Sequence, residues 1–278
     1  MKFRPLVLKF GGELLEDKTH LATVVSGVAA IVASGAPVVI VHGGGKEIDA
    51  ALKHAGIEKR QIDGLRITDE PTLEIVVSVL AGTVNTRFVA ALNTAGVKAV
   101  GLTGADAGCG LSDRAEPHRA VDGRSVDLEQ VGVPSADADM DLVRTLTRHG
   151  FVPVVACIGV GREGQLFNVN ADTLAGHFAA RLDARRLVIA GTTAGVLDDA
   201  GGTVRELDPA GIASLVANRT ATAGMIAKLR ACEHAVAGGV DEVVIVDGRN
   251  ASALVAAATE DAPEAATRIA ANAAISKG

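Results

Sequence analysis

The 278-residue chain contains no tryptophan, no tyrosine and only six phenylalanines. Its core must therefore be built from aliphatic side chains, although apolar residues make up 48% of the sequence. A bound nucleotide base would have to be held by aliphatic packing and backbone groups rather than by aromatic stacking. The length is sufficient for one large α/β domain, or for two lobes with a substantial core.

Cysteine and positive charge are also scarce. Cys109, Cys157 and Cys232 are odd in number and far apart, without the spacing of a zinc site, so we predict buried, reduced thiols. The net charge of −6 argues against a general nucleic-acid-binding protein, and it means that an anionic substrate would need locally placed cations. No signal peptide and no apolar run of about 20 residues is visible, which predicts a cytoplasmic protein that does not span a membrane.

Several familiar motifs do not fit. The glycines at 43–45 do not form the G-x-G-x-x-G fingerprint of a dinucleotide site. The chain has neither G-x-S-x-G nor the Walker pattern G-x-x-x-x-G-K-[ST]. A dehydrogenase, an α/β-hydrolase and a P-loop enzyme are therefore not supported.

Apolar strand patterns alternate with helical patterns along the whole chain, which predicts a mostly parallel sheet covered by helices on both faces. Ligands of such sheets lie beyond the carboxyl ends of the strands. Four turns are expected to converge there: Lys9–Gly12, His42–Gly45, Gly159–Asp172 and Gly191–Gly195.

The first of these turns, in the stretch LKFGG, is typical of a phosphate site. Lys9 ends an apolar strand and places a cation at the edge of the sheet, while Gly11 and Gly12 let backbone N–H groups approach a ligand. An ordinary strand-to-helix turn is the alternative. The run Gly43–Gly45 opens a helix and also favours an anion, whereas we interpret His42 as a packed histidine rather than a base.

Other polar residues have two interpretations each. The guanidinium of Arg66 suits a carboxylate, but a lone loop arginine is usually solvated. Asn168, Asn170 and Asp172 lead into a helix and could simply cap it. Lys228, in the first turns of a later helix, is by itself an ordinary surface lysine.

Three longer segments complete the prediction. A helix of about 20 residues begins near Pro71, and part of its apolar stripe could form a subunit interface. Residues 103–135, with a hairpin tip at 121–124, are the expected mobile lid. Residues 251–278 are rich in alanine and predict at best a weak helix.

Eight segments occur in one order along nearly the whole chain. They are Lys9–Gly12, Val41–Gly45, Asp63–Asp69, Leu80–Asn85, Ala99–Gly104, Ile158–Val160, Asn168–Asp172 and Gly224–Lys228. Together they resemble the amino-acid kinase family. The resemblance implies a single αβα-sandwich domain over 1–278, in which about 1–165 holds the substrate and a dimer interface and about 166–278 holds ATP.

The resemblance also implies an activity. ATP, accompanied by Mg²⁺, would phosphorylate the side-chain carboxylate of N-acetyl-L-glutamate to an acyl phosphate in arginine biosynthesis. Lys9 and Lys228 would be the transition-state lysines, and Asp172 would hold them. Substrate contacts are implied for Gly44, Gly45, Arg66 and Asn168. Phosphate or ATP contacts are implied for Gly11, Gly12, Thr192, Thr193, Gly195 and Met225. No metal site made by the protein is expected.

The chain departs from the family pattern at Thr192, where the family usually has an aspartate beside the nucleotide, so ATP affinity or nucleotide preference is left open. Arginine-sensitive members carry an extra N-terminal helix that builds a hexamer. Only eight residues precede Lys9 here, so we expect a homodimer that arginine does not inhibit. A nitrogen-sensing regulatory partner is left open.

Two alternatives compete with this interpretation. A kinase of carrier-bound α-aminoadipate is the nearest within the family, and a non-catalytic ligand-binding relative is the alternative outside enzymes. An aspartokinase is disfavoured because no C-terminal regulatory domain remains, and a UMP kinase because Arg66 suits an amino-acid carboxylate.

Overall fold

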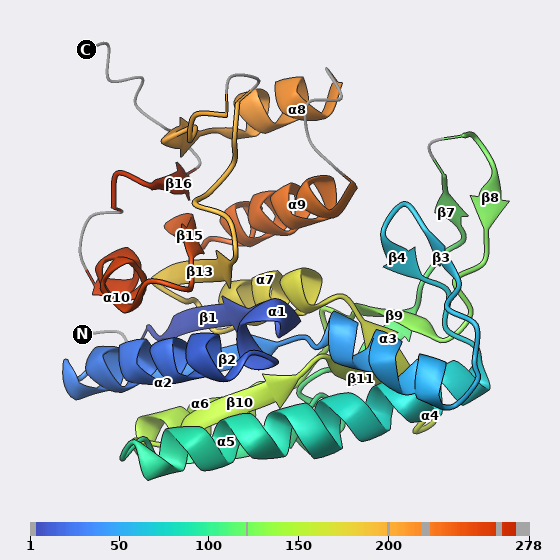
Figure 1. The fold of residues 1–278 in the computed structure, drawn as a ribbon, viewed down its shortest axis with the longest axis horizontal. Coiled ribbons are helices and arrows are strands. Elements are labelled where there is room, and N and C mark those ends of the chain that lie inside the picture. The colour runs from blue at the N-terminus through green and yellow to red at the C-terminus, as the bar shows by residue number, and fades with distance from the viewer. Residues whose placement is uncertain (1–3, 121, 199–200, 218–222, 260–262, 271–278) are drawn as a thin grey trace.

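The computed structural model describes residues 4–120, 122–198, 201–217, 223–259 and 263–270. Its centre is an eight-stranded sheet in the order β14-β16-β15-β13-β1-β2-β10-β5 (Figure 1). The strands are β1 (Leu6–Phe10), β2 (Val38–His42), β5 (Ala99–Thr103), β10 (Val152–Ala156), β13 (Arg186–Gly191), β14 (Glu206–Leu207), β15 (Glu242–Asp247) and β16 (Ala266–Ile269). The six strands from β15 to β5 are parallel, and β16 runs antiparallel to β15. The predicted, mostly parallel sheet is thus confirmed.

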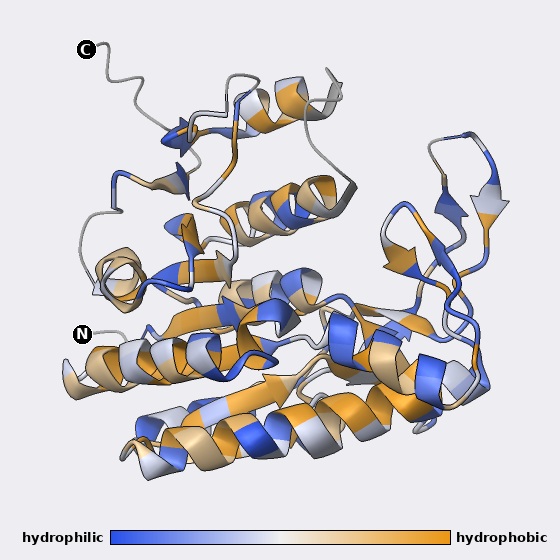
Figure 2. Cartoon of the chain, in the orientation of Figure 1, coloured by the Kyte–Doolittle hydropathy of each residue, from blue (hydrophilic) through white to orange (hydrophobic). Residues whose placement is uncertain are grey.

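The central strands carry the hydrophobic core. Every residue of β1, β2, β10 and β13 is buried, as expected for parallel strands covered on both faces. Figure 2 shows the hydrophobic residues concentrated in these strands and along the helices that cover them. Cys109, Cys157 and Cys232 are buried free thiols, as predicted.

Helices cover both faces of the sheet. They are α1 (Gly12–Leu15), α2 (Lys18–Ala33), α3 (Gly45–His54), α4 (Glu70–Val77), α5 (Asn85–Thr94), α6 (Asp141–Arg148), α7 (Ala171–Arg181), α8 (Pro209–Ala217), α9 (Ala223–Ala237) and α10 (Ala251–Thr259). Successive side chains of a strand point to opposite faces. Phe10 packs edge-on against Phe88 of α5, and its neighbour Lys9 bonds to Asp172 of α7, so α5 and α7 lie on opposite faces.

The predicted long helix spans Glu70–Thr94, with a π-helical segment η1 (Ser78–Val84) between α4 and α5. Such wide turns are frequent at functional sites. Here Leu80 lies against Gly44, and Asn85 bonds to His42 and to the Val154 carbonyl inside the sheet. In the part of the chain that the structure describes, this is the one helix long and apolar enough to cross a membrane, a test that core helices of soluble proteins also pass.

A second layer lies beside the carboxyl ends of the strands. A four-stranded sheet contains β11 (Ile158–Val160), β12 (Leu166–Val169), β9 (Val131–Pro134) and β6 (Ser112–Arg114), and the 3₁₀ turn η2 (Asp106–Gly108) precedes it. Two neighbouring hairpins lie beside it (Figure 1): β3 (Gln61–Ile62) with β4 (Leu65–Arg66), between α3 and α4, and β7 (His118–Arg119) with β8 (Ser125–Val126), between β6 and β9. The hairpin expected at 121–124 is present, although Val121 itself lies outside the described residues.

The glycine-rich turn expected from Gly159 is present as the turn of a hairpin: residues 161–165 connect β11 to β12, and Gly159 itself belongs to β11. One sequence prediction was wrong. The segment after residue 250 is more ordered than a weak helix. Helix α10 buries Leu254 against α2, and β16 is an interior strand between β14 and β15. Its alanine-rich composition gave no helical periodicity, so only the packing reveals it. Residues 271–278 lie outside the described residues.

Candidate active site

A cavity of about 270 Å³ lies at the carboxyl ends of β1 and β2. It is lined by Lys9, Gly11, Gly12, Glu13, Gly43, Gly44, Gly45, Ile48, Gly64, Leu65, Arg66, Leu80, Val131, Cys157, Asn168, Asn170, Ala171 and Asp172. Three of the four turns expected at this edge therefore contribute to one cavity. The place agrees with the general rule that parallel sheets bind ligands beyond their strand ends.

Asp172 joins two lysines from distant parts of the chain. The Nζ atom of Lys9 lies 2.9 Å from Asp172 Oδ1, and Nζ of Lys228 lies 3.5 Å from the same oxygen. Lys9 comes from the central strand β1, Asp172 from the first turn of α7, and Lys228 from α9. The three side chains are largely buried, so two ammonium groups share one carboxylate away from bulk water.

This sharing shapes the protonation of the three groups. Burial opposes the charge of Lys9, but Asp172 more than offsets it and the pKa of Lys9 lies above its usual value. Burial likewise opposes the charge of Asp172, yet Lys9 and Lys228 hold its pKa below the usual value. Burial and the charge of Lys9 together lower the pKa of Lys228 in spite of Asp172. With both lysines protonated, these three groups together carry one net positive charge, which an incoming anion would neutralise.

Local sequence fixes the position of Asp172. The side chain of Asn170 caps α7, because its Oδ1 accepts hydrogen bonds from the backbone N–H groups of Asp172 and Thr173 at 2.9 and 3.0 Å. The capping interpretation of this motif is thus correct for Asn170, while Asp172 is left to face the lysines. A helix N-terminus also favours an anionic ligand nearby.

Glycines are required where the turns after β1 and β2 meet. A Cβ atom on Gly12 would stand 2.6 Å from the Cα of Gly44, and one on Gly44 would stand 2.8 Å from Leu80 Cδ2. Gly45 is the first residue of α3, whose first-turn N–H groups have no partner within the helix. The Gly11 N–H already donates to the Ala190 carbonyl at 3.2 Å, so this particular amide is engaged with the sheet.

Sequence reasoning missed Glu13. Its carboxylate lies beside Gly11, where a Cβ on that glycine would collide with it, and it also lines the cavity. An acidic residue directly after a glycine pair matches no known motif, and only the fold of the short helix α1 shows that its carboxylate lies beside Gly11. It adds to the negative potential felt by Lys9 and Lys228.

Arg66 is braced rather than solvated. Its Nη2 bonds to Asp49 Oδ1 and lies 3.4 Å from the Gly45 carbonyl oxygen, while Nη1 is buried without a hydrogen-bond partner among the described residues. A buried guanidinium nitrogen without an acceptor is costly, and a bound carboxylate would satisfy it. Asn168 also lines the cavity, and its Nδ2 donates to Thr68 Oγ1 at 3.0 Å. Sequence reasoning missed Asp49 because it lies one helix away from Arg66.

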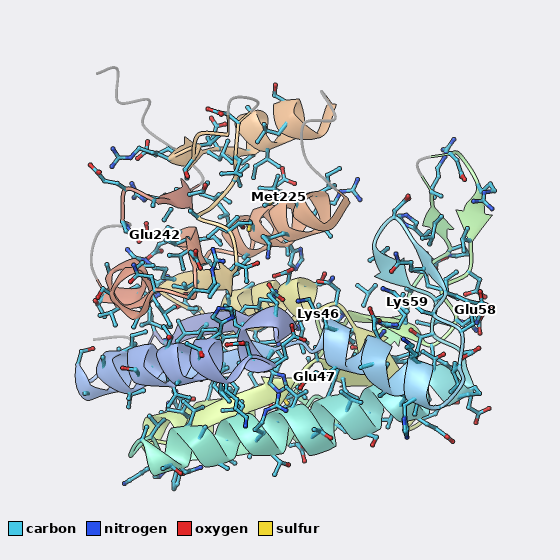
Figure 3. All side chains as sticks on the ribbon, in the orientation of Figure 1. Lys46, Glu47, Glu58, Lys59, Met225 and Glu242 are labelled. Carbon is cyan, nitrogen blue, oxygen red and sulfur yellow. The ribbon has the colours of Figure 1, made fainter. Side chains whose placement is uncertain are left out.

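Most of the residues that the sequence assigns to ATP binding do not line this cavity. Thr192, Thr193, Gly195 and Met225 are absent from the described lining of this cavity. Gly195 has φ +116°, and a Cβ there would stand 2.5 Å from Thr267 Oγ1, so its glycine serves the packing of the loop against β16. Met225 packs at the start of α9 against the hydrophobic core (Figure 3). Within the described residues, no group of three or more His, Cys, Asp or Glu side chains could hold a metal ion.

Comparison with known proteins decides the family. The model of the amino acid kinase family matches residues 4–247. The chain belongs to the amino acid kinase family. The acetylglutamate kinase of Novosphingobium aromaticivorans is 40% identical over 255 residues, covering 88% of this chain and 84% of that protein. The acetylglutamate kinase of Sphingopyxis alaskensis is 41% identical over 248 residues, covering 87% and 82%.

Solved structures agree with this family assignment. The smu.665 protein of Streptococcus mutans has a TM-score of 0.79 at 25% identity, and the alignment covers 96% of this chain and 98% of that one. The N-acetylglutamate synthase of Neisseria gonorrhoeae, solved with coenzyme A and N-acetyl-glutamate, has a TM-score of 0.82 at 26% identity. That alignment covers 98% of this chain and 61% of the synthase. The amino acid kinase fold predicted from the sequence is thereby confirmed.

Proposed function

We propose that the chain is an acetylglutamate kinase, which transfers a phosphoryl group from ATP to the side-chain carboxylate of N-acetyl-L-glutamate. The single observation that carries the proposal is the bridge from Lys9 through Asp172 to Lys228 at the edge of a cavity lined by glycines. Family membership and relatives of about 40% identity that are named acetylglutamate kinase support it.

The chemistry asks for charge neutralisation rather than for a general base. The attacking group is a carboxylate with an ordinary pKa of about 4.3, so it is already ionised at neutral pH. The difficulty is to bring this anion onto a polyanion, which requires alignment and positive charge at the transferring group. Lys9, which lines the cavity, and Lys228, which lies 3.5 Å from the cavity residue Asp172, supply the charge, and Asp172 positions both ammonium groups.

Other residues of the cavity lining orient the substrate. Arg66, braced by Asp49, offers its unpartnered Nη1 to the α-carboxylate of the substrate. Asn168 donates to the bound amino acid, and the N–H groups around Gly44 and Gly45 face its reacting end. Gly12 and the loop with Thr192, Thr193 and Gly195, together with Met225, are assigned to ATP.

Magnesium is proposed to arrive with the nucleotide. Mg²⁺ is usually held by phosphate oxygens, water and one or two carboxylates, and it neutralises phosphate charge when bound. Glu13 fits such a contact because it is the carboxylate of the described cavity lining that Lys9 and Lys228 do not engage directly. We also propose a cytoplasmic homodimer that arginine does not inhibit, with part of the Glu70–Thr94 helix at the interface. Light scattering during gel filtration measures the mass directly.

A hydroxamate assay tests the activity. Hydroxylamine traps an acyl phosphate, so ATP and N-acetyl-L-glutamate should give a coloured iron–hydroxamate complex, whereas L-glutamate and N-acetyl-L-aspartate should give far less. Lys9→Ala and Lys228→Ala should each lower kcat by about 10²–10³-fold. Lys46→Ala is the matched control, because Lys46 is exposed and pairs only with Glu16 in the described structure. Full activity in either the Lys9 or the Lys228 variant, or no product from the native protein, would refute the proposal.

A further inference from the structure

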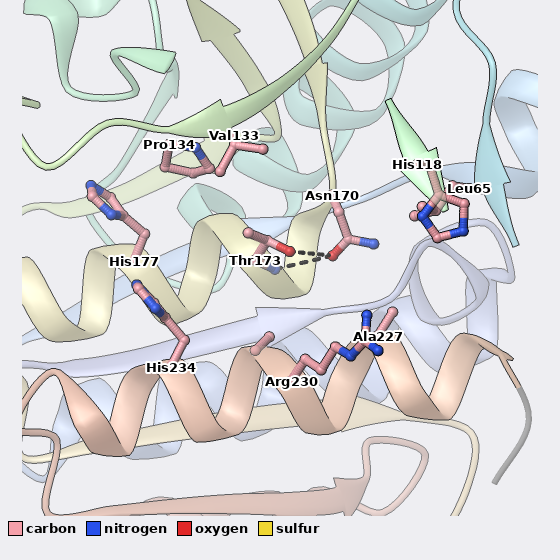
Figure 4. Close-up of a pocket in the computed structure, with 11 residues that line it drawn as sticks. Leu65, His118, Val133, Pro134, Asn170, Thr173, His177, Ala227, Arg230 and His234 are labelled. Atoms are coloured by element: carbon pink, nitrogen blue, oxygen red, sulfur yellow. Dashed lines mark hydrogen bonds between the residues drawn. The ribbon is translucent and has the colours of Figure 1, made fainter. Parts of the chain in front are cut away.

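The helix start at Gly44 lacks the side-chain cap that fixes α7. Figure 4 shows that cap, in which Oδ1 of Asn170 accepts hydrogen bonds from the backbone N–H and the hydroxyl of Thr173 at 3.0 and 3.3 Å. Asn170 lines the candidate active-site cavity and also a second cavity, of about 330 Å³, between α7 and α9. Gly44, which precedes α3, has no side chain and makes no such cap. The position of this turn must therefore be held by other contacts.

One nitrogen atom of Arg87, in α5, joins the two helices that follow the glycine turns. Its Nη2 donates at 2.7 Å to Oε1 of Glu47, in the first turn of α3 (Figure 3). The same Nη2 donates at 3.0 Å to the carbonyl oxygen of Leu15, the last residue of α1. The last carbonyls of a helix have no partner within that helix, so this donor satisfies one of them. Because α1 begins at Gly12 and α3 at Gly45, a single guanidinium ties the segments that carry the two glycine turns.

Other residues at the start of α5 contact the chain before each glycine turn. Asn85 bonds to Nε2 of His42 at 3.0 Å, and Phe88 packs edge-on against His42 and against Phe10. Phe10 and His42 end the strands β1 and β2, directly before the glycines. One helix therefore holds the chain just before both glycine turns, and Arg87 of the same helix holds it just after them.

Arg87 also neutralises a carboxylate that lies close to an anion-binding turn. Oε2 of Glu47 is buried, has no hydrogen-bond partner among the described residues, and would stand 3.8 Å from a Cβ atom on Gly44. A glutamate at this position of a helix often accepts a hydrogen bond from the N–H of the capping residue. Here the N–H of Gly44 has no acceptor in the part of the chain that the structure describes, so it is available to a ligand. Without Arg87, the charge of Glu47 would repel a phosphate or carboxylate bound at that turn.

We propose that Arg87 is a positioning residue for phosphoryl transfer, which sets the separation of the turns at Gly12 and Gly44 and cancels the charge of Glu47 beside them. Arg87 is not among the described residues that line the active-site cavity, so it acts through the turns. A Cβ atom on Gly12 would stand 2.6 Å from the Cα of Gly44, so the two turns are already in contact. A misplacement of about 1 Å at a reacting centre can lower a rate by about 10²-fold. The inference rests on the proposed function, because it requires an anion at these turns.

Steady-state kinetics of the full-length protein separate the two effects of Arg87. In Arg87→Ala, kcat should fall by about tenfold or more because the turns lose their tie. The KM for N-acetyl-L-glutamate should rise by about threefold or more because Glu47 is left without a counter-charge. In the double variant Arg87→Ala with Glu47→Gln, KM should return toward the native value while kcat stays low. A loss of stability alone would not divide kcat from KM in this way.

Arg4→Ala is the matched control. Arg4 also donates to backbone carbonyls, those of Asp183 and Ala184, and to the carboxylate of Asp241, but it precedes β1, at the edge of the sheet opposite the candidate site. Its kcat and KM should equal the native values. If Arg87→Ala does not fold, Arg87→Lys replaces it: the charge is kept, so KM should stay native, whereas the shorter side chain should still lower kcat by about threefold or more.

Backbone amide spectra test the geometry without any activity. The ¹H–¹⁵N resonances of Gly44 and Gly45 should move in Arg87→Ala and keep their positions in Arg4→Ala. Unchanged glycine resonances, a native kcat in Arg87→Ala, or a KM that does not recover in the double variant would each overturn the proposal. If the glycine resonances move but the native protein forms no acyl phosphate, the proposed function is wrong and the role of Arg87 in holding the two turns stands.

Discussion

Gly176 of α7 lies so close to Ala231 of α9 that a Cβ atom on Gly176 would stand 2.8 Å from the Ala231 carbonyl oxygen. The backbones of the two helices are therefore in close contact, because Gly176 has no side chain. This contact sets the distance between Lys228 of α9 and Asp172 of α7. Alanine at 176 must push α9 outward. We expect Gly176→Ala to lower kcat by about tenfold and to lower the unfolding free energy by about 1–3 kcal/mol. Gly82→Ala, where the same test finds open space, is the control. Native kinetics in Gly176→Ala would show that the helix spacing does not govern the lysine bridge.

The shared carboxylate predicts a particular pH dependence. Phosphoryl transfer needs Lys228 protonated, and its pKa lies below the usual value because of burial and the charge of Lys9. Activity should therefore fall on the alkaline side at a lower pH than an ordinary lysine would give. Asp172→Asn removes the group that favours both charged lysines, so the alkaline limb should move to still lower pH. Rate profiles from pH 6 to 10 measure this, and coincident limbs would contradict it.

The same variant should also be less stable. Two buried ammonium groups without a counter-charge destabilise the folded state, typically by about 3–5 kcal/mol. The double variant Asp172→Asn with Lys228→Gln removes one of those charges and should regain part of the loss. Urea unfolding at pH 7 compares the three proteins. Equal loss in the single and double variants would mean that charge is not the cause.

Arg66 and Asp49 should separate binding from catalysis. Arg66→Ala removes the predicted partner of the substrate carboxylate. The KM for N-acetyl-L-glutamate should therefore rise by the factor that corresponds to a loss of about 2–3 kcal/mol of binding free energy, with little change in kcat. Asp49→Asn loosens the brace and should raise KM less. Lys59→Ala is the control, because Lys59 also bonds to Asp49 but does not line the cavity. A fall in kcat without a rise in KM would contradict the proposal that Arg66 binds the substrate carboxylate.

His42 makes stability fall in mild acid. It is fully buried, its Nδ1 donates to the Gly43 carbonyl at 3.1 Å, and its Nε2 accepts from Asn85 at 3.0 Å, which suits a neutral ring. Burial lowers the pKa of His42 to about 4. The pKa of His42 in the unfolded chain is about 6.5. Between about pH 6.5 and about pH 4 the unfolded chain therefore binds a proton that the folded protein does not. As the pH is lowered through this range, the free energy of unfolding decreases by up to about 3 kcal/mol.

The measurement is urea unfolding at several pH values between 7 and 4. His177, whose pKa is also about 4, adds a similar loss in the same window. In His42→Asn the pH slope should be smaller than in the native protein by about 1.4 kcal/mol per pH unit, the contribution of one proton. Parallel stability curves for the two proteins would show that His42 is not the titrating group.

Much of the fold was predictable because local patterns carry it. Short runs of Val, Ile and Leu between helical patterns identify buried parallel strands, as at Val38–Val41. Asn170 precedes α7 as a capping residue should, and Gly45 opens α3 after a glycine run. The π-helical segment within Glu70–Thr94 was not predictable from the sequence, and its residue Leu80 packs against Gly44, which is far away in the chain.

The residues of the candidate active site also fall into those that the sequence predicts and those that only the packing reveals. The sequence alone determined that Lys9 lies at the end of a strand that two glycines follow, since neighbouring residues share one element and one edge. It could not determine that Lys228, 56 positions after Asp172, points at the same oxygen, or that Asp49 braces Arg66. Those relationships arise where helices and strands distant in sequence pack together, because residues that are far apart along the chain can lie near or far in space. Tertiary structure therefore decided the charge balance of the site, the place of Glu13 and the existence of the second cavity.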